Sequence, residues 1–350
     1  MGDEATGHAD AGIDVPALES WFAENVPGSS SPLRFERIAG GHSNLTYRVL
    51  DGAGGEWALR RPPLGKRLGS AHDMAREHRV VSALGPTPVP VAPAVALCED
   101  ESVNEAPFYV MEFVSGPVLR GLAEADLFPD EGDRRAIGER VADTLVAIHA
   151  VDPDAVGLGD LGRREEYVAR QLRRWQGQWE SSKTRELPVV DRVHERLAAR
   201  IPPQGPATIV HGDYRLDNMI LTEAGEVAAV VDWELCTLGD PLADLGTLLS
   251  SWREAGEEMA GMTAGSMPST VPGFLTRREA VERYGRRRGV DVSTAPYYYV
   301  FGMFKIAVVL QQIYHRYHIG QTKDQRFAIL DQVAEMLFVA ARQRSLSPTL

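Results

Sequence analysis

Two short apolar runs, each followed by acids at fixed spacing, constrain this chain more than any other feature. The first run, Thr208–Val210, leads into the segment HGDYRLDN, which places Asp213 five residues before Asn218. The second run, residues 227–231, leads directly to Asp232, fourteen residues beyond that asparagine. Apolar runs of this length, bounded by turn residues, are typical of short buried strands. The pattern therefore predicts two strands that present two carboxylates and one amide at their ends.

This set of side chains meets the needs of phosphoryl transfer. One carboxylate must orient an attacking hydroxyl and accept its proton, while an amide oxygen and a second carboxylate hold the Mg²⁺ ions that clamp the phosphates. We assign the first role to Asp213 and predict Mg²⁺ ligands at Asn218 and Asp232. Arg215, two residues past Asp213, is expected to face the acceptor or the transferring phosphoryl group. The alternative, in which these residues only cap turns, requires the whole spaced set to arise by chance.

The motifs resemble those of the aminoglycoside phosphotransferase and choline kinase family, the small-molecule relatives of protein kinases. Protein kinases use His-Arg-Asp-x-x-x-x-Asn and then Asp-Phe-Gly, where this chain has His-Gly-Asp ending at Asp213 and Asp-Trp-Glu starting at Asp232. The family's downstream Gly-Asp-Pro-x-x-Asp-Leu element is matched at Asp240 and Asp244. Asp240 is expected to cap a helix, Asp244 to tie that helix to the catalytic loop, and His211 to brace the loop.

The resemblance implies an α+β, bilobal, protein-kinase-like fold, and the local patterns agree with it. Residues 1–12 are predicted to be disordered, residues 13–113 to form the nucleotide-binding lobe, and residues 114–350 to form a larger helical lobe with the catalytic loop and acceptor site. A helix is expected from Asp14 to about residue 26. The small lobe should hold a five-stranded antiparallel sheet with one inserted helix at 71–84, its strands at 33–38, 45–50, 56–60, 94–98 and 108–113. Helical patterns follow at 134–150, 163–179, 188–199, 241–252, 277–288, 296–317 and 323–344.

The resemblance places the contacts to ATP in two segments of the small lobe. The loop GGHSN between the first two strands is not a GxGxxG loop, but its glycines let the backbone approach a phosphate. We predict nucleotide contacts there from Gly41, Ser43 and Asn44. The last strand before the expected hinge at 113–117 should border adenine, with contributions from Met111 and Phe113.

Arg60 ends the third strand, where kinases place a lysine that pairs with a glutamate on the following helix. That helix offers Glu77, so we predict an Arg60–Glu77 pair that aims a positive charge at the phosphates. Arg61 is the alternative if the strand register slips by one residue. The departure from lysine is the one feature in favour of a second class of function, a pseudokinase that binds nucleotide without turning it over. The intact Asp213, Asn218 and Asp232 argue against that class.

The acceptor pocket is not fixed by these motifs. Residues 167–179 place Tyr167, Gln171, Trp175 or Arg174, and Gln178 on one helical face, which indicates either a pocket or ordinary helix packing. The candidate acceptor helices carry cations where kinases of polycationic aminoglycosides carry acids: Arg170, Arg173, Arg174 and Lys305.

Three segments, 59–63, 170–175 and 232–235, most resemble the subgroup of kinase-like domains associated with acyl-CoA dehydrogenases. That resemblance implies a small-molecule hydroxyl acceptor such as a hydroxyacyl-CoA, and association with such a dehydrogenase. An aminoglycoside or another small alcohol remains the alternative acceptor, and the motifs do not distinguish ATP from GTP as donor.

Bulk composition limits the partners further. The formal net charge of −12 argues against binding to nucleic acid or to an anionic membrane surface. The two cysteines, Cys98 and Cys236, fit neither a zinc site nor a disulfide framework. The acidic N-terminus shows no secretory signal pattern, and no apolar run is long enough to cross a bilayer. We therefore expect a cytoplasmic protein with reduced thiols.

Overall fold

The computed structural model describes residues 12–38, 44–64, 73–254, 256–257 and 267–347. The chain divides into two compact units, one formed by residues 1–116 with 228–236 and the other by residues 117–227 with 237–350. Gly41 and Ser43 lie outside the described residues, as does most of the N-terminal segment predicted to be disordered. The segment 228–236, which carries Asp232, thus belongs with the first unit although it follows the catalytic loop in sequence.

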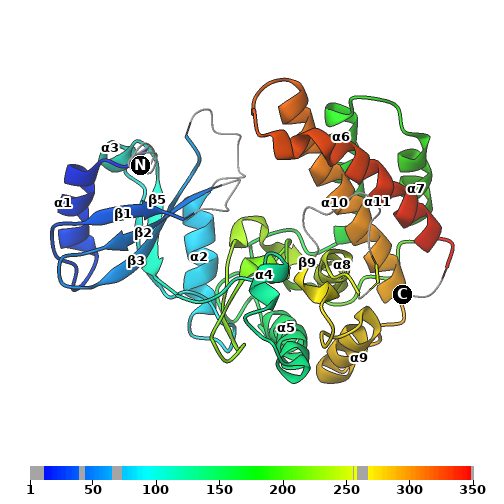
Figure 1. Cartoon of the computed structure of the whole chain (residues 1–350), viewed down its shortest axis with the longest axis horizontal. Coiled ribbons are helices and arrows are strands. Elements are labelled where there is room, and N and C mark those ends of the chain that lie inside the picture. Colours follow the sequence, from blue (N-terminus) through cyan, green and yellow to red (C-terminus); the bar gives the residue numbers. More distant parts are fainter. Residues whose placement is uncertain (1–11, 39–43, 65–72, 255, 258–266, 348–350) are drawn as a thin grey trace. The chain divides into compact units, whose positions relative to one another are not determined.

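A five-stranded antiparallel sheet forms the centre of the first unit, as predicted (Figure 1). Each strand is antiparallel to its neighbours. The strands lie in the order β1 (Arg34–Arg37), β2 (Leu45–Leu50), β3 (Glu56–Arg61), β5 (Phe108–Glu112) and β4 (Ala94–Cys98). The one helix predicted within this region is α2 (Met74–Leu84), and a single-turn helix, α3 (Glu101–Asn104), follows β4.

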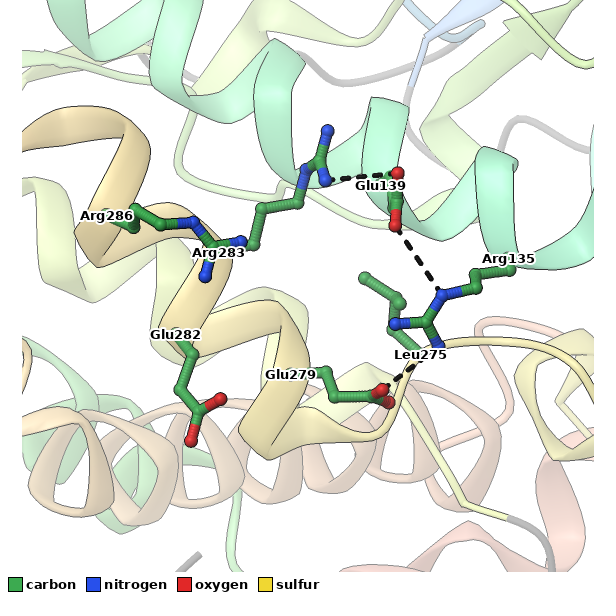
Figure 2. Close-up of a pocket in the computed structure, with 7 residues that line it drawn as sticks. All are labelled: Arg135, Glu139, Leu275, Glu279, Glu282, Arg283 and Arg286. Carbon is green, nitrogen blue, oxygen red and sulfur yellow. Dashed lines mark hydrogen bonds and ion pairs between the residues drawn. The ribbon is translucent and has the colours of Figure 1, made fainter.

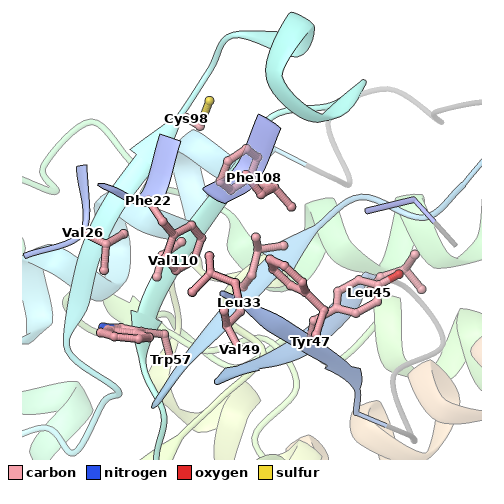
Figure 3. Packing of buried hydrophobic residues seen from close by; sticks show 13 residues of the cluster. Phe22, Val26, Leu33, Leu45, Tyr47, Val49, Trp57, Cys98, Phe108 and Val110 are labelled. Carbon is pink, nitrogen blue, oxygen red and sulfur yellow. The ribbon is translucent and has the colours of Figure 1, made fainter. Parts of the chain in front are cut away.

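The N-terminal helix α1 (Val15–Asn25) covers one face of this sheet. Asp14 caps the helix by accepting a hydrogen bond from Ala17 N at 3.1 Å. Phe22 on α1 is fully buried against Tyr47, Trp57 and Val110 of the strands, as Figure 3 shows. The helix is therefore part of the small unit's core and not a free arm.

The opposite face of the sheet packs against α2. Met74 of α2 is buried in a second cluster with Ala58, Tyr109 and Met111. Because side chains alternate along a strand, Arg60 shares the α2 face of β3 with Ala58. The strand alternation therefore decides which arginine of β3 meets α2.

The second unit is mostly helical, as expected. Its helices are α4 (Leu122–Ala125), α5 (Glu131–Ala150), α6 (Tyr167–Ser182), α7 (Pro188–Ala198), α8 (Pro241–Ser251), α9 (Arg277–Arg288), α10 (Ala295–His318) and α11 (Leu330–Arg344). The long helix α10 packs against α6, α7, α8 and α11 (Figure 1). No helix among the described residues combines the length and apolar character needed to cross a bilayer.

Two predicted helices begin later than their patterns indicated. The helix expected at 163–179 starts at Tyr167, because Glu166 adopts a left-handed conformation with φ of 51° that interrupts helical geometry. The helix expected at 323–344 begins as a short 3₁₀ turn, Gln325–Ile329, before α11 starts at Leu330. Local apolar spacing extends across both junctions, so periodicity alone cannot place them.

Two glycines set the crossing of α8 and α10. A Cβ on Gly246 would lie 2.1 Å from the carbonyl oxygen of Tyr298, and one on Gly302 would lie 2.3 Å from the carbonyl oxygen of Gly246. The two helix backbones therefore touch where these glycines meet. This close approach brings polar side chains of α8 and α10 together beneath the catalytic loop.

An array of ion pairs joins α5 and α9 (Figure 2). Glu139 lies 3.0 Å from Arg283 and 3.6 Å from Arg135, and Arg135 lies 2.9 Å from Glu279. These side chains line a shallow polar hollow that contains none of the predicted site residues. Because Arg135, Glu139, Glu279 and Arg283 pair with one another across the two helices, we interpret the hollow as a helix–helix contact.

Candidate active site

The predicted catalytic loop, residues 211–218, starts where β6 (Thr208–Val210) of the second unit ends. This strand pairs with β9 (Thr237–Gly239) in antiparallel register and delivers His211, which is fully buried. Gly212 follows with φ of 85°, a left-handed conformation that favours glycine. This turn aims the chain so that Asp213 and the short 3₁₀ helix Leu216–Asn218 lie ahead of β7 (Met219–Leu221).

The loop brings two other predicted site residues, Asn218 and Arg215, to the Asp213 carboxylate. Asn218 Nδ2 donates to Asp213 Oδ2 at 3.2 Å and to the Asp213 carbonyl at 2.9 Å. Arg215 Nε lies 3.3 Å from the same Oδ2. Burial opposes ionisation, but the positive charges of Arg215 and Lys305 hold the pKa of Asp213 below its ordinary value. The carboxylate is therefore charged at neutral pH and fixed in orientation.

Asn218 and Arg215 are both constrained by this arrangement. Because Asp213 can only accept, the amide nitrogen of Asn218 must face it, and Oδ1 of the nearly buried Asn218 points the other way. That oxygen is of the type that binds Mg²⁺. Arg215 also pairs with Asp217, Nη2 lying 3.0 Å from Oδ2. Arg215 thus joins the two acids of its own loop, and its predicted role toward the acceptor stays a prediction.

Asp244 anchors the catalytic loop, as the motif predicted. Its buried carboxylate accepts hydrogen bonds from His211 N at 2.6 Å and Gly212 N at 2.9 Å. His149 Nε2 lies 3.4 Å from the same carboxylate. Although burial raises it, the pKa of Asp244 is lowered overall, chiefly by its hydrogen bond with His149. His211 Nδ1 in turn accepts from Asp213 N at 3.2 Å, which confirms its bracing role.

Asp240 also has its predicted function. Its side chain caps α8 by accepting from Leu242 N at 3.0 Å. The other carboxylate oxygen accepts a hydrogen bond of 2.5 Å from the Tyr298 hydroxyl on α10. The cap therefore links α8 to α10 as well as starting α8.

Lys305, expected among the cations of the acceptor helices, is buried beside the Asp213 loop. It lies on α10 and donates to the Gly212 carbonyl. Its Nζ lies 3.8 Å from Asp213 Oδ1 and 3.5 Å from Thr247 Oγ1 of α8. The signal was present in the sequence, because a lone lysine in the long apolar run of α10 has to find partners within the fold.

The first unit collects a separate polar network on the α2 face of its sheet. Arg60 Nε lies 3.0 Å from Glu77 Oε1, so the predicted pair is confirmed. The same guanidinium pairs through Nη2 with the Asp232 carboxylate. Tyr109 of β5 hydrogen bonds with Glu77. Burial raises the pKa of Glu77, against the opposing charge of Arg60. Arg60 thus joins the helix glutamate to a predicted metal ligand.

The alternative pairing through Arg61 is wrong. Arg61 lies on the other face of β3, where its guanidinium donates to the carbonyl of Gly12. The register pairs Arg60 with Thr46 of β2, and Arg60 Nη1 lies 3.3 Å from Thr46 Oγ1. Period-2 alternation therefore separates the two arginines completely.

Asp232 sits in a strained turn. Its φ of 69° and ψ of 56° are left-handed, a conformation that aspartate tolerates better than most residues but that is uncommon outside glycine. The indole of Trp233 is buried and donates to Val230 O at 2.9 Å, which holds the turn. Asn44 Nδ2 donates to Glu234 Oε2 at 2.9 Å and ties the start of β2 to the same turn. The turn leaves about a third of the Asp232 side chain exposed, 30%.

The two residues predicted beside adenine differ in their surroundings. Met111 is buried in the cluster on the α2 face, and Phe113 is only partly buried at the end of β5. The guanidinium of Arg48 lies over the Phe113 ring, 4.8 Å from its centroid. Both remain predictions as nucleotide contacts.

Helix α6 buries two of the residues predicted for an acceptor face, Trp175 and Tyr167. Trp175 is buried with Val168, Leu172 and Trp179, so it belongs to the packed face and not with Gln171 and Gln178. Tyr167 is also buried, with its ring against Gly239 of β9. Arg173 and Arg174 are exposed on this helix, together with Gly177, Glu180 and Ser181.

Comparison with known proteins gives the family. A model of the phosphotransferase enzyme family matches residues 34–278. The chain belongs to this family. It is 33% identical over 327 residues to mouse acyl-CoA dehydrogenase family member 10, which covers 88% of this chain and 29% of that protein. The chain spans less than half the length of the curated relatives it matches.

Solved structures give the same fold. A protein from Ralstonia eutropha JMP134, provisionally named an aminoglycoside phosphotransferase, is 34% identical with a TM-score of 0.80, covering 95% of this chain and 98% of that one. A thermostable variant of aminoglycoside phosphotransferase APH(4)-Ia, solved with AMP-PNP and hygromycin B, has a TM-score of 0.60 at 17% identity, covering 94% and 98%. The predicted family, kinase-like fold and enzyme class, a small-molecule phosphotransferase, are thereby confirmed.

Proposed function

We propose that this phosphotransferase moves the γ-phosphoryl group of ATP to a hydroxyl of a small anionic molecule, a hydroxyacyl thioester such as a 4-hydroxyacyl-CoA. The observation that carries the proposal is the catalytic loop, where an ionised Asp213 is held by Asn218, Arg215 and Lys305. A carboxylate fixed in this way can orient an attacking hydroxyl.

Mg²⁺ fits the residues available. Asn218 Oδ1 is turned away from Asp213, and Asp232 offers a partly exposed carboxylate, so both donors are the hard oxygens that Mg²⁺ prefers. The described residues contain no cluster of three or more His, Cys, Asp or Glu side chains that could hold a metal without further ligands. Mg²⁺ is commonly bound by one or two protein oxygens together with substrate phosphates. When bound, the ion would neutralise charge on the phosphates.

The reaction then needs little more from the protein than position. The acceptor oxygen forms a bond to the γ-phosphorus, the bond from that phosphorus to the bridging oxygen breaks, and ADP leaves. Asp213 accepts the hydroxyl proton late, so its lowered pKa is compatible with the role. Arg60, held by Glu77, supplies the permanent positive charge proposed to meet the nucleotide phosphates.

The anionic acceptor is supported by the charges around the loop. Lys305 and Arg215 lie beside Asp213, and Arg174 of α6 is near enough to Lys305 to help depress its pKa, which burial lowers most. A polycationic aminoglycoside would be repelled by this set, whereas a phosphate-bearing acyl carrier would not. The similarity to acyl-CoA dehydrogenase family members supports an acyl thioester. It also supports our proposal that the chain works beside such a dehydrogenase.

One observation favours a second candidate, a nucleotide-binding module without turnover. Arg60 replaces the usual lysine and pairs with Asp232, so the carboxylate proposed to bind Mg²⁺ already has a cationic partner. Such a module would bind ATP and release no ADP.

The test is ADP formation from Mg²⁺–ATP, and from Mg²⁺–GTP, with 4-hydroxyacyl-CoA, 3-hydroxyacyl-CoA, kanamycin and choline. We expect turnover on a hydroxyacyl-CoA that EDTA abolishes and that Asp213→Asn reduces by about 10²–10⁴-fold. Asp217→Asn is the matched control, since Asp217 is a second carboxylate held by Arg215 and should tolerate the change within a few-fold. ATP binding without turnover on any acceptor would favour the non-catalytic module, and failure to bind ATP would overturn both candidates.

A further inference from the structure

Lys305 reaches the catalytic loop from a helix far away in sequence. Its ammonium donates to the carbonyl of Gly212, the residue before Asp213, and lies 3.5 Å from Thr247 Oγ1. The side chain is only 7% exposed. A buried ammonium is costly unless it is paired. A methionine of similar length would avoid this cost, so the fold keeps a charge where an apolar side chain would be simpler.

The contacts to Asp213 are divided between its two oxygens. Asn218 Nδ2 and Arg215 Nε lie 3.2 and 3.3 Å from Oδ2, while Lys305 Nζ lies 3.8 Å from Oδ1. The distance to Oδ1 is too long for a direct hydrogen bond but short enough for a strong interaction between charges. A hydroxyl donating to Oδ1 would therefore sit beside the ammonium without having to displace it.

We propose that Lys305 is a positioning residue for phosphoryl transfer: its charge holds Oδ1 of Asp213 in place to receive the acceptor hydroxyl. The inference rests on the proposed function. The Gly212 carbonyl takes one of the three ammonium protons and fixes the lysine to the loop, and Thr247 orients a second. The third proton of the ammonium faces the Asp213 carboxylate. Lys305 thus acts through Asp213 and does not itself exchange a proton in the reaction.

A purely structural lysine would behave differently from this proposal. Its only task would be to satisfy the Gly212 carbonyl, and a neutral donor of similar length would replace it. Lys305→Gln retains donors for the carbonyl and for Thr247 but removes the charge, whereas Lys305→Met removes both. The pair of variants therefore separates charge from hydrogen bonding. Thr247→Val is the control that removes one partner of the lysine while leaving its charge beside Asp213.

The experiment is steady-state kinetics of wild type and these variants with ATP and the best acceptor, together with the Tm of each protein. We expect Lys305→Gln to keep a Tm close to wild type, to lower kcat by about 10–100-fold, and to leave KM for ATP within about threefold. Lys305→Met should lose kcat by at least as much and also lower Tm. Thr247→Val should stay within about threefold of wild-type kcat.

A second readout asks whether Lys305 acts through Asp213. In the Asp213→Asn background, adding Lys305→Gln should change the residual kcat by less than about twofold, because the group that the lysine positions is no longer a carboxylate. The inference is overturned, while the proposed function stands, if Lys305→Gln alone keeps at least half of wild-type kcat. It is also overturned if Lys305→Gln lowers kcat by the same factor in the Asp213→Asn background as in wild type. If the wild type phosphorylates no acceptor, the proposed function fails and the inference fails with it.

Discussion

Replacing Asp244 tests the packing that holds the catalytic loop. The carboxylate is 2% exposed and accepts from two backbone N–H groups, those of His211 and Gly212, at 2.6 and 2.9 Å. Asp244→Ala leaves both donors buried without that acceptor, at about 1–3 kcal/mol each. It also removes the partner of His149 at 3.4 Å. We therefore expect a loss of about 3–6 kcal/mol, a large part of the ~5–15 kcal/mol that stabilises a typical domain.

The assay is the free energy of unfolding from guanidinium denaturation. Asp244→Asn should cost about half as much, because its amide oxygen can still accept one of the two bonds while its NH₂ opposes the other donor. Asp143→Asn is the control, since Asp143 forms an ion pair with Arg283 at 2.8 Å but keeps 26% of its side chain exposed. That change should cost at most about 1 kcal/mol. A loss below about 1 kcal/mol for Asp244→Ala would refute the argument that this carboxylate anchors the loop.

Three further predictions concern other parts of the fold. The folded-state pKa of Asp244 lies below its ordinary value of 3.8, so its ionisation contributes stability above about pH 4 that is lost as the pH falls through the folded pKa. In Asp244→Asn, the free energy of unfolding should therefore fall less steeply with decreasing pH below about pH 4. Gly302→Ala should lower the free energy of unfolding by about 1–3 kcal/mol, because its Cβ would meet an α8 carbonyl at 2.3 Å. The control Gly177→Ala, in open space on α6, should be neutral or stabilising. Equal denaturation midpoints for the two variants would count against the close helix crossing. Arg60→Ala leaves Glu77 buried without its main cationic partner and should lower the free energy of unfolding by about 3–5 kcal/mol. The same change should abolish the rise in Tm that Mg²⁺–ATP gives the wild type. An unchanged rise would show that Arg60 is not part of the nucleotide site.

The catalytic loop could be predicted from sequence because its chemistry is local. Asp213, Arg215 and Asn218 lie within six residues of one another, so their spacing alone brings their side chains together once a tight turn forms. The same is true of the Asp240 cap. The Arg60–Glu77 pair was also accessible, because strand alternation and helix position each follow from short-range periodicity.

Contacts between distant segments could not be predicted in this way. The pair between Arg60 and Asp232 joins residues 172 positions apart, and Lys305 reaches Gly212 across 93 positions. Both depend on how helices and strands pack, and in the second case on two glycines that let α8 and α10 touch. The role of Trp175 on α6 stayed open for a related reason, since an indole at helical spacing fits a pocket or a core equally well until the neighbouring helices are placed.

The central claim is that a hydroxyl held by Asp213 attacks the γ-phosphorus of ATP directly. The most direct measurement is a single-turnover reaction with γ-labelled Mg²⁺–ATP and a hydroxyacyl-CoA, quenched and analysed by mass spectrometry for the position of the label. The account predicts that the label appears as a phosphate ester on the acceptor hydroxyl with wild type, and that this product is lost with Asp213→Asn. Label recovered as inorganic phosphate or on the protein, or an undiminished ester with Asp213→Asn, would contradict it.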